Sequence, residues 1–214
     1  MPIQANTADL SNWILYDRLT AAQNTTTAAQ YQMFVTPYNS GTKTKADTNL
    51  SLPRQLEAPQ WFNCQSIGFE VAPDMWLPDV TAFLKAYYFE FWVGNKIYAE
   101  GPLECAQSGY GISGSFAATG TNATPITQAS VVNNGVPSGL PSFNLTLPPG
   151  LNILDAYGKP VVTDGIMGVT ILQSQTFYVN LYSAAGVALA ATAGGGVGLS
   201  LRCLLTGILS RGVQ

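Results

Sequence analysis

The feature that most constrains the fold is a run of strict alternation between residues 87 and 93, followed by a two-residue turn. One face of this extended segment would carry Tyr87, Phe89, Phe91 and Val93, and the other Tyr88, Glu90 and Trp92. Gly94 and Asn95 tolerate the positive φ angles of a tight hairpin turn, and residues 96–99 then return. The segment predicts a β-hairpin. Aromatic residues on both faces indicate that a second sheet covers one face and a neighbour the other.

The same period of two recurs along the chain. It predicts strands at residues 31–38, 62–71, 143–147, 151–164, 169–183 and 198–212, with a turn at Tyr157-Gly158. The closing segment places Leu199, Leu201, Cys203 and Leu205 on one inner face. About eight strands without a convincing long amphipathic helix are typical of an all-β sandwich or barrel, and this number suits a single jelly roll with long loops.

The ends and loops divide the chain further. Residues 1–30 are expected to form an N-terminal arm that docks on another surface, or a disordered tail. Within it, residues 9–12 would cap a short helix with Trp13, Leu15, Tyr16 and Leu19 as its apolar positions. The sandwich domain is then residues 31–214, and residues 107–139 are a long neutral loop insertion at one end of it.

Charge is scarce and unevenly distributed. Charged residues make up 10% of the chain, against about 25% in an average domain. There is no charged residue between Glu104 and Asp155, nor between Asp164 and Arg202. Large permanent interfaces are depleted in charge, so these segments favour extensive contact with other protein. The alternative is a soluble protein that relies on uncharged polar side chains.

Composition excludes several kinds of chemistry. Histidine is absent, which removes histidine bases, Ser-His-Asp systems and histidine metal ligands. Nine Lys and Arg residues supply no basic stripe for nucleic acid. The three cysteines Cys64, Cys105 and Cys203 lack metal-site spacing. We expect buried free thiols, with a disulfide between two of them left open, and no catalytic, cofactor-binding or metal-binding residue.

Acidic and aromatic residues leave two weaker alternatives. Glu90, Glu100 and Glu104 would be the carboxylates of a hydrolase, although we expect Glu90 and Glu100 on an outer face or paired with Lys96. Trp61, Trp76 and Trp92 would form a sugar-stacking platform in a lectin-like module, although core or interface packing is favoured. The set Asp74, Asp79 and Asp155 lacks a calcium-loop pattern, and Gly194–Gly198 lacks the context of a phosphate loop.

Residues 184–201 are uncharged but contain three consecutive glycines, so we expect a small-residue loop or short helix there and no membrane span. Residues 1–8 do not have the pattern of a secretory signal.

Three segments together resemble the jelly-roll capsid proteins of icosahedral bacterial viruses. They are the hairpin FEFWVGNKIYAEGPL with the following QSGYGISG, the pair PPGLNILDAYGKPVVT and ILQSQTFYVNL, and the closing LSLRCLLTGILSRGVQ. The resemblance implies a structural virion protein, either a major capsid protein or a penton or minor shell protein. The alternative function is a lectin-like carbohydrate-binding module on a phage fibre or cell surface.

The resemblance also implies partners and a location. The subunit would self-assemble and contact other capsid proteins in the virion, after assembly in the host cytoplasm. Many capsid proteins with this fold bind the genome through an Arg-rich N-terminal arm, but residues 1–17 here contain no Lys or Arg. We therefore expect no nucleic-acid binding by the arm, and an internal membrane or inner protein layer would lie beneath the shell.

Overall fold

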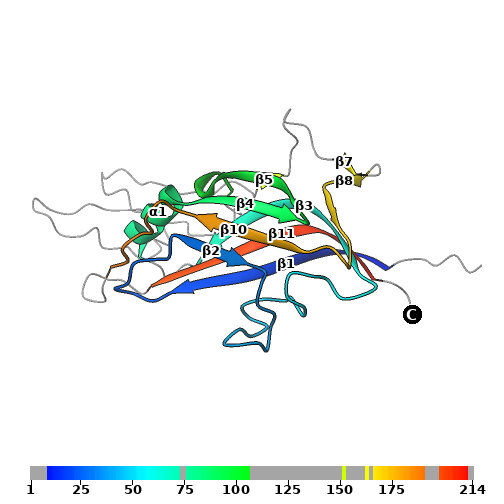
Figure 1. Ribbon diagram of the computed structural model, residues 1–214, viewed down its shortest axis with the longest axis horizontal. Helices are drawn as coiled ribbons and strands as arrows, with labels where there is room; N and C mark the ends of the chain where they lie inside the picture. The colour runs from blue at the N-terminus through cyan, green and yellow to red at the C-terminus, as the bar shows by residue number, and fades with distance from the viewer. Residues whose placement is uncertain are drawn as a thin grey trace, which may run out of the picture.

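The chain forms an all-β sandwich of two antiparallel sheets (Figure 1). The computed structural model describes residues 9–72, 76–106, 151–152, 162–163, 166–190 and 198–211. The five-stranded sheet contains β1 (Asp9–Ala21), β11 (Leu199–Arg211), β3 (Trp61–Val71), β6 (Leu151–Asn152) and β9 (Val169–Ile171). The four-stranded sheet contains β2 (Gln30–Met33), β10 (Phe177–Tyr182), β4 (Tyr88–Val93) and β5 (Lys96–Pro102). The all-β prediction is confirmed.

The strands pair in a nested order. The first long strand, β1, pairs with the last, β11, and β2 pairs with β10. Next inward, β3 pairs with β9 and β6, and the central hairpin pairs β4 with β5. The resulting orders are β1-β11-β3-β6, with β9 also on β3, and β2-β10-β4-β5. A small third pair joins β7 (Val162–Thr163) to β8 (Ile166–Met167).

Phenylalanine side chains fill the space between the sheets. Phe69 of β3 packs against Phe89 of β4, with ring centroids 5.4 Å apart, and Phe34 packs against Phe177 at 5.6 Å. The side chains expected to face inward in the 87–93 alternation are all buried. The hairpin turn is also as expected, with Gly94 at φ 60°. Burial of one face at period two therefore accounts for these strands.

The expected helix at residues 9–19 is wrong, because these residues lie within β1, which pairs with β11 along its whole length. Leu15 and Asp17 are buried, whereas Leu10 and Ile14 are exposed, which is the period of a strand. Helical spacing also fits the apolar residues of this segment, which are Trp13, Leu15, Tyr16 and Leu19. The strand forms instead of the helix because β11 is available to pair with it. Residues 9–21 thus belong to the sandwich and do not form part of a peripheral arm.

One ten-residue helix, α1 (Leu77–Ala86), connects β3 to β4 and was not identified from the sequence. Pro78 lies in its first turn, where a missing backbone N–H costs nothing, and Asp79 and Lys85 suit the helix dipole. Val80, Phe83 and Leu84 are buried against the core. A short 3₁₀ turn, η1 (Leu103–Ala106), follows β5. The described residues contain no helix long and apolar enough to cross a membrane.

Several expectations fall outside the described residues. They are the neutral insertion at 107–139, the strand at 143–147 and the turn at Tyr157-Gly158. The cysteines are free, as expected; Cys64 and Cys203 are buried, but Cys105 is exposed on η1. Burial raises the pKa of both the Cys64 and Cys203 thiols, so neither behaves as a reactive thiolate.

Candidate interaction surfaces

The free edge of β1 is partly closed by the loop between β2 and β3. The Asn49 amide donates to the Ile14 carbonyl at 2.7 Å, and its oxygen accepts from the Tyr16 N–H at 3.0 Å. The Thr48 hydroxyl donates to the Tyr16 carbonyl at 3.0 Å. These side chains replace a neighbouring strand over this part of the edge, which limits uncontrolled edge-to-edge pairing.

An apolar patch lies on the outer face of the five-stranded sheet. Leu10 and Ile14, both on β1, are 59% and 42% exposed. Ile208 of β11 pairs with Asn12, which lies between Leu10 and Ile14 on the same face of β1, and its side chain is half-buried. We call Leu10, Ile14 and Ile208 the β1 patch. Exposed apolar side chains that cluster on one face mark contact surfaces more often than scattered ones do.

The charges around this face are neutralised within the chain. Arg18 pairs with Asp47 at 3.4 Å and donates to the Ser200 hydroxyl at 2.8 Å. Arg202 pairs with Glu70 at 3.1 Å and lies over the Tyr16 ring. The outer face therefore offers apolar and hydrogen-bonding groups with little net charge, as permanent protein contacts require.

Asp17 anchors the loop to the sheet from inside. Its side chain is fully buried, accepts from the Phe34 N–H at 2.7 Å and forms an ion pair with Lys43. Burial raises the pKa of the Asp17 carboxyl, although Lys43 and the Phe34 N–H act in the opposite direction. Local sequence pattern does not reveal this ion pair, because Asp17 and Lys43 are brought together only by the position of the loop against β1.

The outer face of the four-stranded sheet carries two stacked aromatic pairs, Tyr88–Tyr182 and Trp92–Tyr178, with centroids 5.3 and 6.0 Å apart. Glu90 lies across from Asn180 between these pairs and accepts from the Trp92 indole N–H at 2.8 Å. The hairpin pattern predicts that Tyr88 and Trp92 lie on the face opposite the core, and this prediction is confirmed.

The three candidate carboxylates are only partly brought together. Glu90 and Glu100 lie directly across from each other on β4 and β5, whereas Glu104 lies on η1. Of the two alternatives expected for Glu90 and Glu100, the outer face is the one observed. The ion pairs among the described residues do not include Lys96, whose ammonium lies over the Tyr98 ring at 4.9 Å. Glu90 remains hydrogen-bonded to Trp92, an arrangement that suits a structural role.

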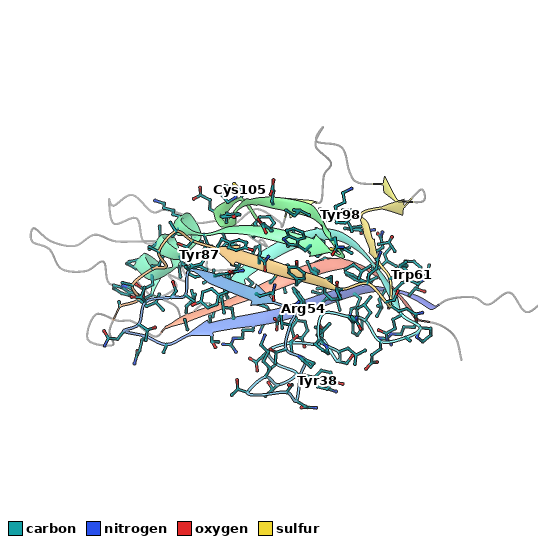
Figure 2. All side chains as sticks on the ribbon, in the orientation of Figure 1. Tyr38, Arg54, Trp61, Tyr87, Tyr98 and Cys105 are labelled. Atoms are coloured by element: carbon teal, nitrogen blue, oxygen red, sulfur yellow. The ribbon has the colours of Figure 1, made fainter. Side chains whose placement is uncertain are left out.

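The three candidate tryptophans do not form a platform. Trp76 is buried next to α1, and Trp92 lies in the four-stranded sheet. Trp61 begins β3, at the end of the sandwich away from α1 (Figure 2). Asp79, one of the candidate calcium ligands, accepts from the Ala190 N–H, and Asp74 and Asp155 lie outside the described residues. Among the residues that the structure describes, no cluster of three metal-ligating side chains is found.

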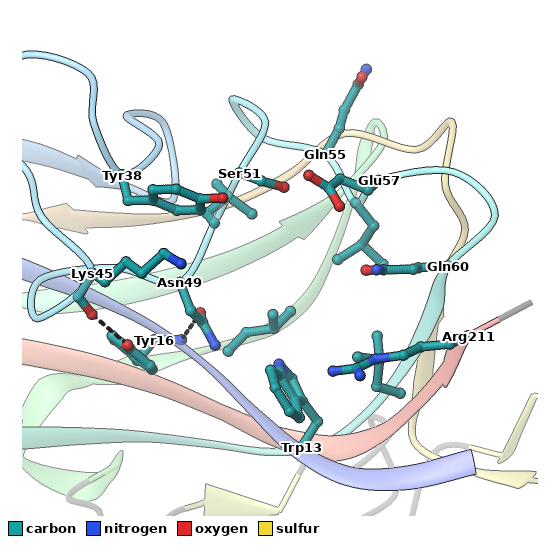
Figure 3. A pocket seen from close by; sticks show the side chains of 14 residues that line it. Trp13, Tyr16, Tyr38, Lys45, Asn49, Ser51, Gln55, Glu57, Gln60 and Arg211 are labelled. Atoms are coloured by element: carbon teal, nitrogen blue, oxygen red, sulfur yellow. Dashed lines mark hydrogen bonds between the residues drawn. The ribbon is translucent and has the colours of Figure 1, made fainter. Parts of the chain in front are cut away.

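A cavity of about 350 Å³ opens between β1, the loop at residues 38–60 and the end of β11 (Figure 3). Its floor is apolar and consists of Leu15, Leu50, Leu56 and Leu209, all buried. Its walls carry aromatic and polar side chains, namely Trp13, Tyr16, Tyr38, Lys45, Asn49, Ser51, Gln55, Glu57, Gln60 and Arg211. Local sequence pattern does not reveal this site, because its three lining segments are far apart along the chain.

Comparison with known proteins adds no relative. No protein-family model matches the chain, and neither a curated protein nor a solved structure matches it.

Proposed function

We propose that this chain is a single-jelly-roll subunit of an icosahedral viral capsid, either the major capsid protein or a penton or minor shell protein. In this proposal it contacts copies of itself and other capsid proteins in the virion. An inner membrane or protein layer lies beneath the shell, and the N-terminal residues do not hold the genome. The proposal assigns the chain no catalytic residue, cofactor or metal.

The nested strand pairing carries this proposal. In a jelly roll, a long antiparallel hairpin of eight strands rolls up so that first pairs with last, second with second-last, and so on inward. The observed pairs β1·β11, β2·β10, β3·β9 and β4·β5 follow that rule. With the two-residue strand β6 set aside, the sheet orders β1-β11-β3-β9 and β2-β10-β4-β5 also fit it.

Surface chemistry gives the second support. A fold alone does not establish a function, so the shell role needs surfaces suited to other subunits. The β1 patch is apolar, and the adjacent arginines are already paired with carboxylates. The long uncharged segments of the sequence are also consistent with surfaces that face protein.

Assembly is the direct test of the proposal. We expect the purified protein to form particles, or closed pentamers or hexamers, when its native mass is measured by light scattering and large species are imaged by negative stain. The symmetry of those species separates a penton from a major capsid protein. A monomer that persists at high protein concentration would contradict the shell role.

The β1 patch provides a sharper test. Ile14→Asp is expected to reduce assembly at least tenfold, because a buried, unpaired carboxylate at a contact is costly. Folding should change by less than about 0.5 kcal/mol, since Ile14 is exposed in the free subunit. The matched control is Leu172→Asp, at a leucine that is 47% exposed outside the patch. Equal assembly of both variants would remove the patch from the interface.

Salt should have a small effect on assembly. Contacts that are mainly apolar and hydrogen-bonded are not screened by ions, so particle yield should change less than about twofold between roughly 0.1 and 1 M salt. Sedimentation of preformed particles at the two concentrations measures this. Complete dissociation at the higher concentration would show that ion pairs between subunits dominate instead.

A further inference from the structure

We propose that the cavity between β1, the loop at residues 38–60 and the end of β11 binds one carboxylate-bearing sugar unit of an acidic glycan. This site goes beyond the shell role and does not rest on it, since the cavity lies within a single chain.

Polar groups from separate segments converge on the same space. Figure 3 shows the ends of Lys45 and Gln60 directed into the cavity from opposite sides, and the guanidinium of Arg211 directed in beside Gln60. Trp13 lies on the lower side of this view, and Ser51 and Glu57 lie on its upper side. A concave site with an apolar floor and a few convergent polar groups is the usual form of a small-molecule site.

The two cations are held in place but keep free donors. Lys45 lies over the Tyr38 ring at 5.0 Å, and Arg211 lies over the Trp13 ring at 4.7 Å. Within the described part of the chain, the ion pairs occupy Arg18, Lys43 and Arg202, so neither cavity cation has a carboxylate partner. Stacking on a ring orders each side chain and leaves its N–H groups available to an anion.

Charge complementarity selects an anionic ligand. The cavity contains two cations against one carboxylate, Glu57, in a protein whose net charge is −3. Arg211 presents a planar fork that suits a carboxylate in a bidentate arrangement, and Lys45 adds a second donor. The cavity therefore attracts a carboxylate against the overall charge of the molecule.

The remaining lining selects a sugar over other anions. Gln60, Ser51 and Glu57 offer both donors and acceptors, which match hydroxyl groups and would stay unsatisfied against an alkyl chain. A bare inorganic anion would leave the indole of Trp13 and the leucine floor without a contact. The volume of about 350 Å³ is at the small end of ligand sites, which suits one ring.

The test compares matched acidic and neutral sugars. We expect the folded protein to bind an oligomer of glucuronate at least tenfold more tightly than the corresponding oligomer of glucose, measured by titration calorimetry at fixed ionic strength. Acetate at the same concentration as the glucuronate oligomer should not compete with it. Equal affinity for the two oligomers, displacement of glucuronate by acetate, or no binding of either oligomer would overturn the proposal.

Variants locate the site. Arg211→Gln and Lys45→Met are each expected to weaken glucuronate binding at least tenfold without lowering the thermal midpoint, because both side chains are exposed at the rim. Lys96→Met is the matched control, since it removes an ammonium that also lies over a tyrosine, at 4.9 Å from the Tyr98 ring, but outside the cavity. Equal loss in all three variants would place binding elsewhere. Native mass, measured in parallel, keeps this result separate from assembly.

Discussion

Replacing Lys43 with methionine is expected to lower the free energy of unfolding by about 3 kcal/mol at pH 7, because removing one partner of a buried ion pair leaves an uncompensated charge. Asp17 is fully buried, whereas the Lys43 side chain is 23% exposed. Without Lys43, the Asp17 carboxylate keeps only the hydrogen bond from the Phe34 N–H and the contact with the Thr48 hydroxyl. Urea unfolding of both proteins at pH 7 measures the difference.

The loss should shrink as the pH falls. Burial already raises the pKa of Asp17 above its ordinary value, and removal of the lysine raises it further. A carboxyl whose pKa is higher in the folded state binds a proton more readily there, so acid favours the folded state down to the pKa of the unfolded chain. The cost in Lys43→Met is therefore present above the folded-state pKa and declines as the pH falls through it.

Lys45→Met is the matched control for this prediction. Lys45 lies in the same loop but is exposed and contacts only the Tyr38 ring through its charge, so its replacement should cost less than about 0.5 kcal/mol. A Lys43→Met variant as stable as the wild type at pH 7, or one that becomes relatively less stable at pH 5, would mean that Asp17 is not held as an ion pair.

Gly207→Ala is expected to cost about 3 kcal/mol, because the new methyl group has no space. A Cβ at this position would lie 1.9 Å from the Asn63 carbonyl oxygen and 3.1 Å from the Cys64 Cα. Both are backbone atoms of β3, and the pairing of β11 with β3 shifts register at Thr206/Gly207. Relief would require the two central strands of the sheet to separate locally. Thermal and urea unfolding measure the cost.

Gly101→Ala is the control, since its Cβ would meet only the Phe89 side chain at an ordinary 3.8 Å. We expect it to change stability by less than about 0.5 kcal/mol. If Gly207→Ala were equally benign, β3 and β11 would have to adjust at the bulge without loss of packing, and the close approach would not constrain the fold.

Local sequence pattern was sufficient to predict a strand where one face of that strand is buried and the other is not. Phe89 and Phe91 alternate with Glu90 and Trp92, and Gly94 supplies a positive φ, so the central hairpin follows from its own residues. The same holds for the inner face of β11. The absence of histidine also excludes histidine bases and histidine metal ligands through composition alone.

Contacts between distant segments decided the rest. The residues of β1 fit a helix and a strand alike, and only pairing with β11, near the other end of the chain, selects the strand. The burial of Asp17 beside Lys43 and the cavity enclosed by Trp13, Lys45 and Arg211 depend on where the loop at residues 38–60 lies against β1. Periodicity reports which face of a segment avoids water, but it carries no information about which other segment covers that face.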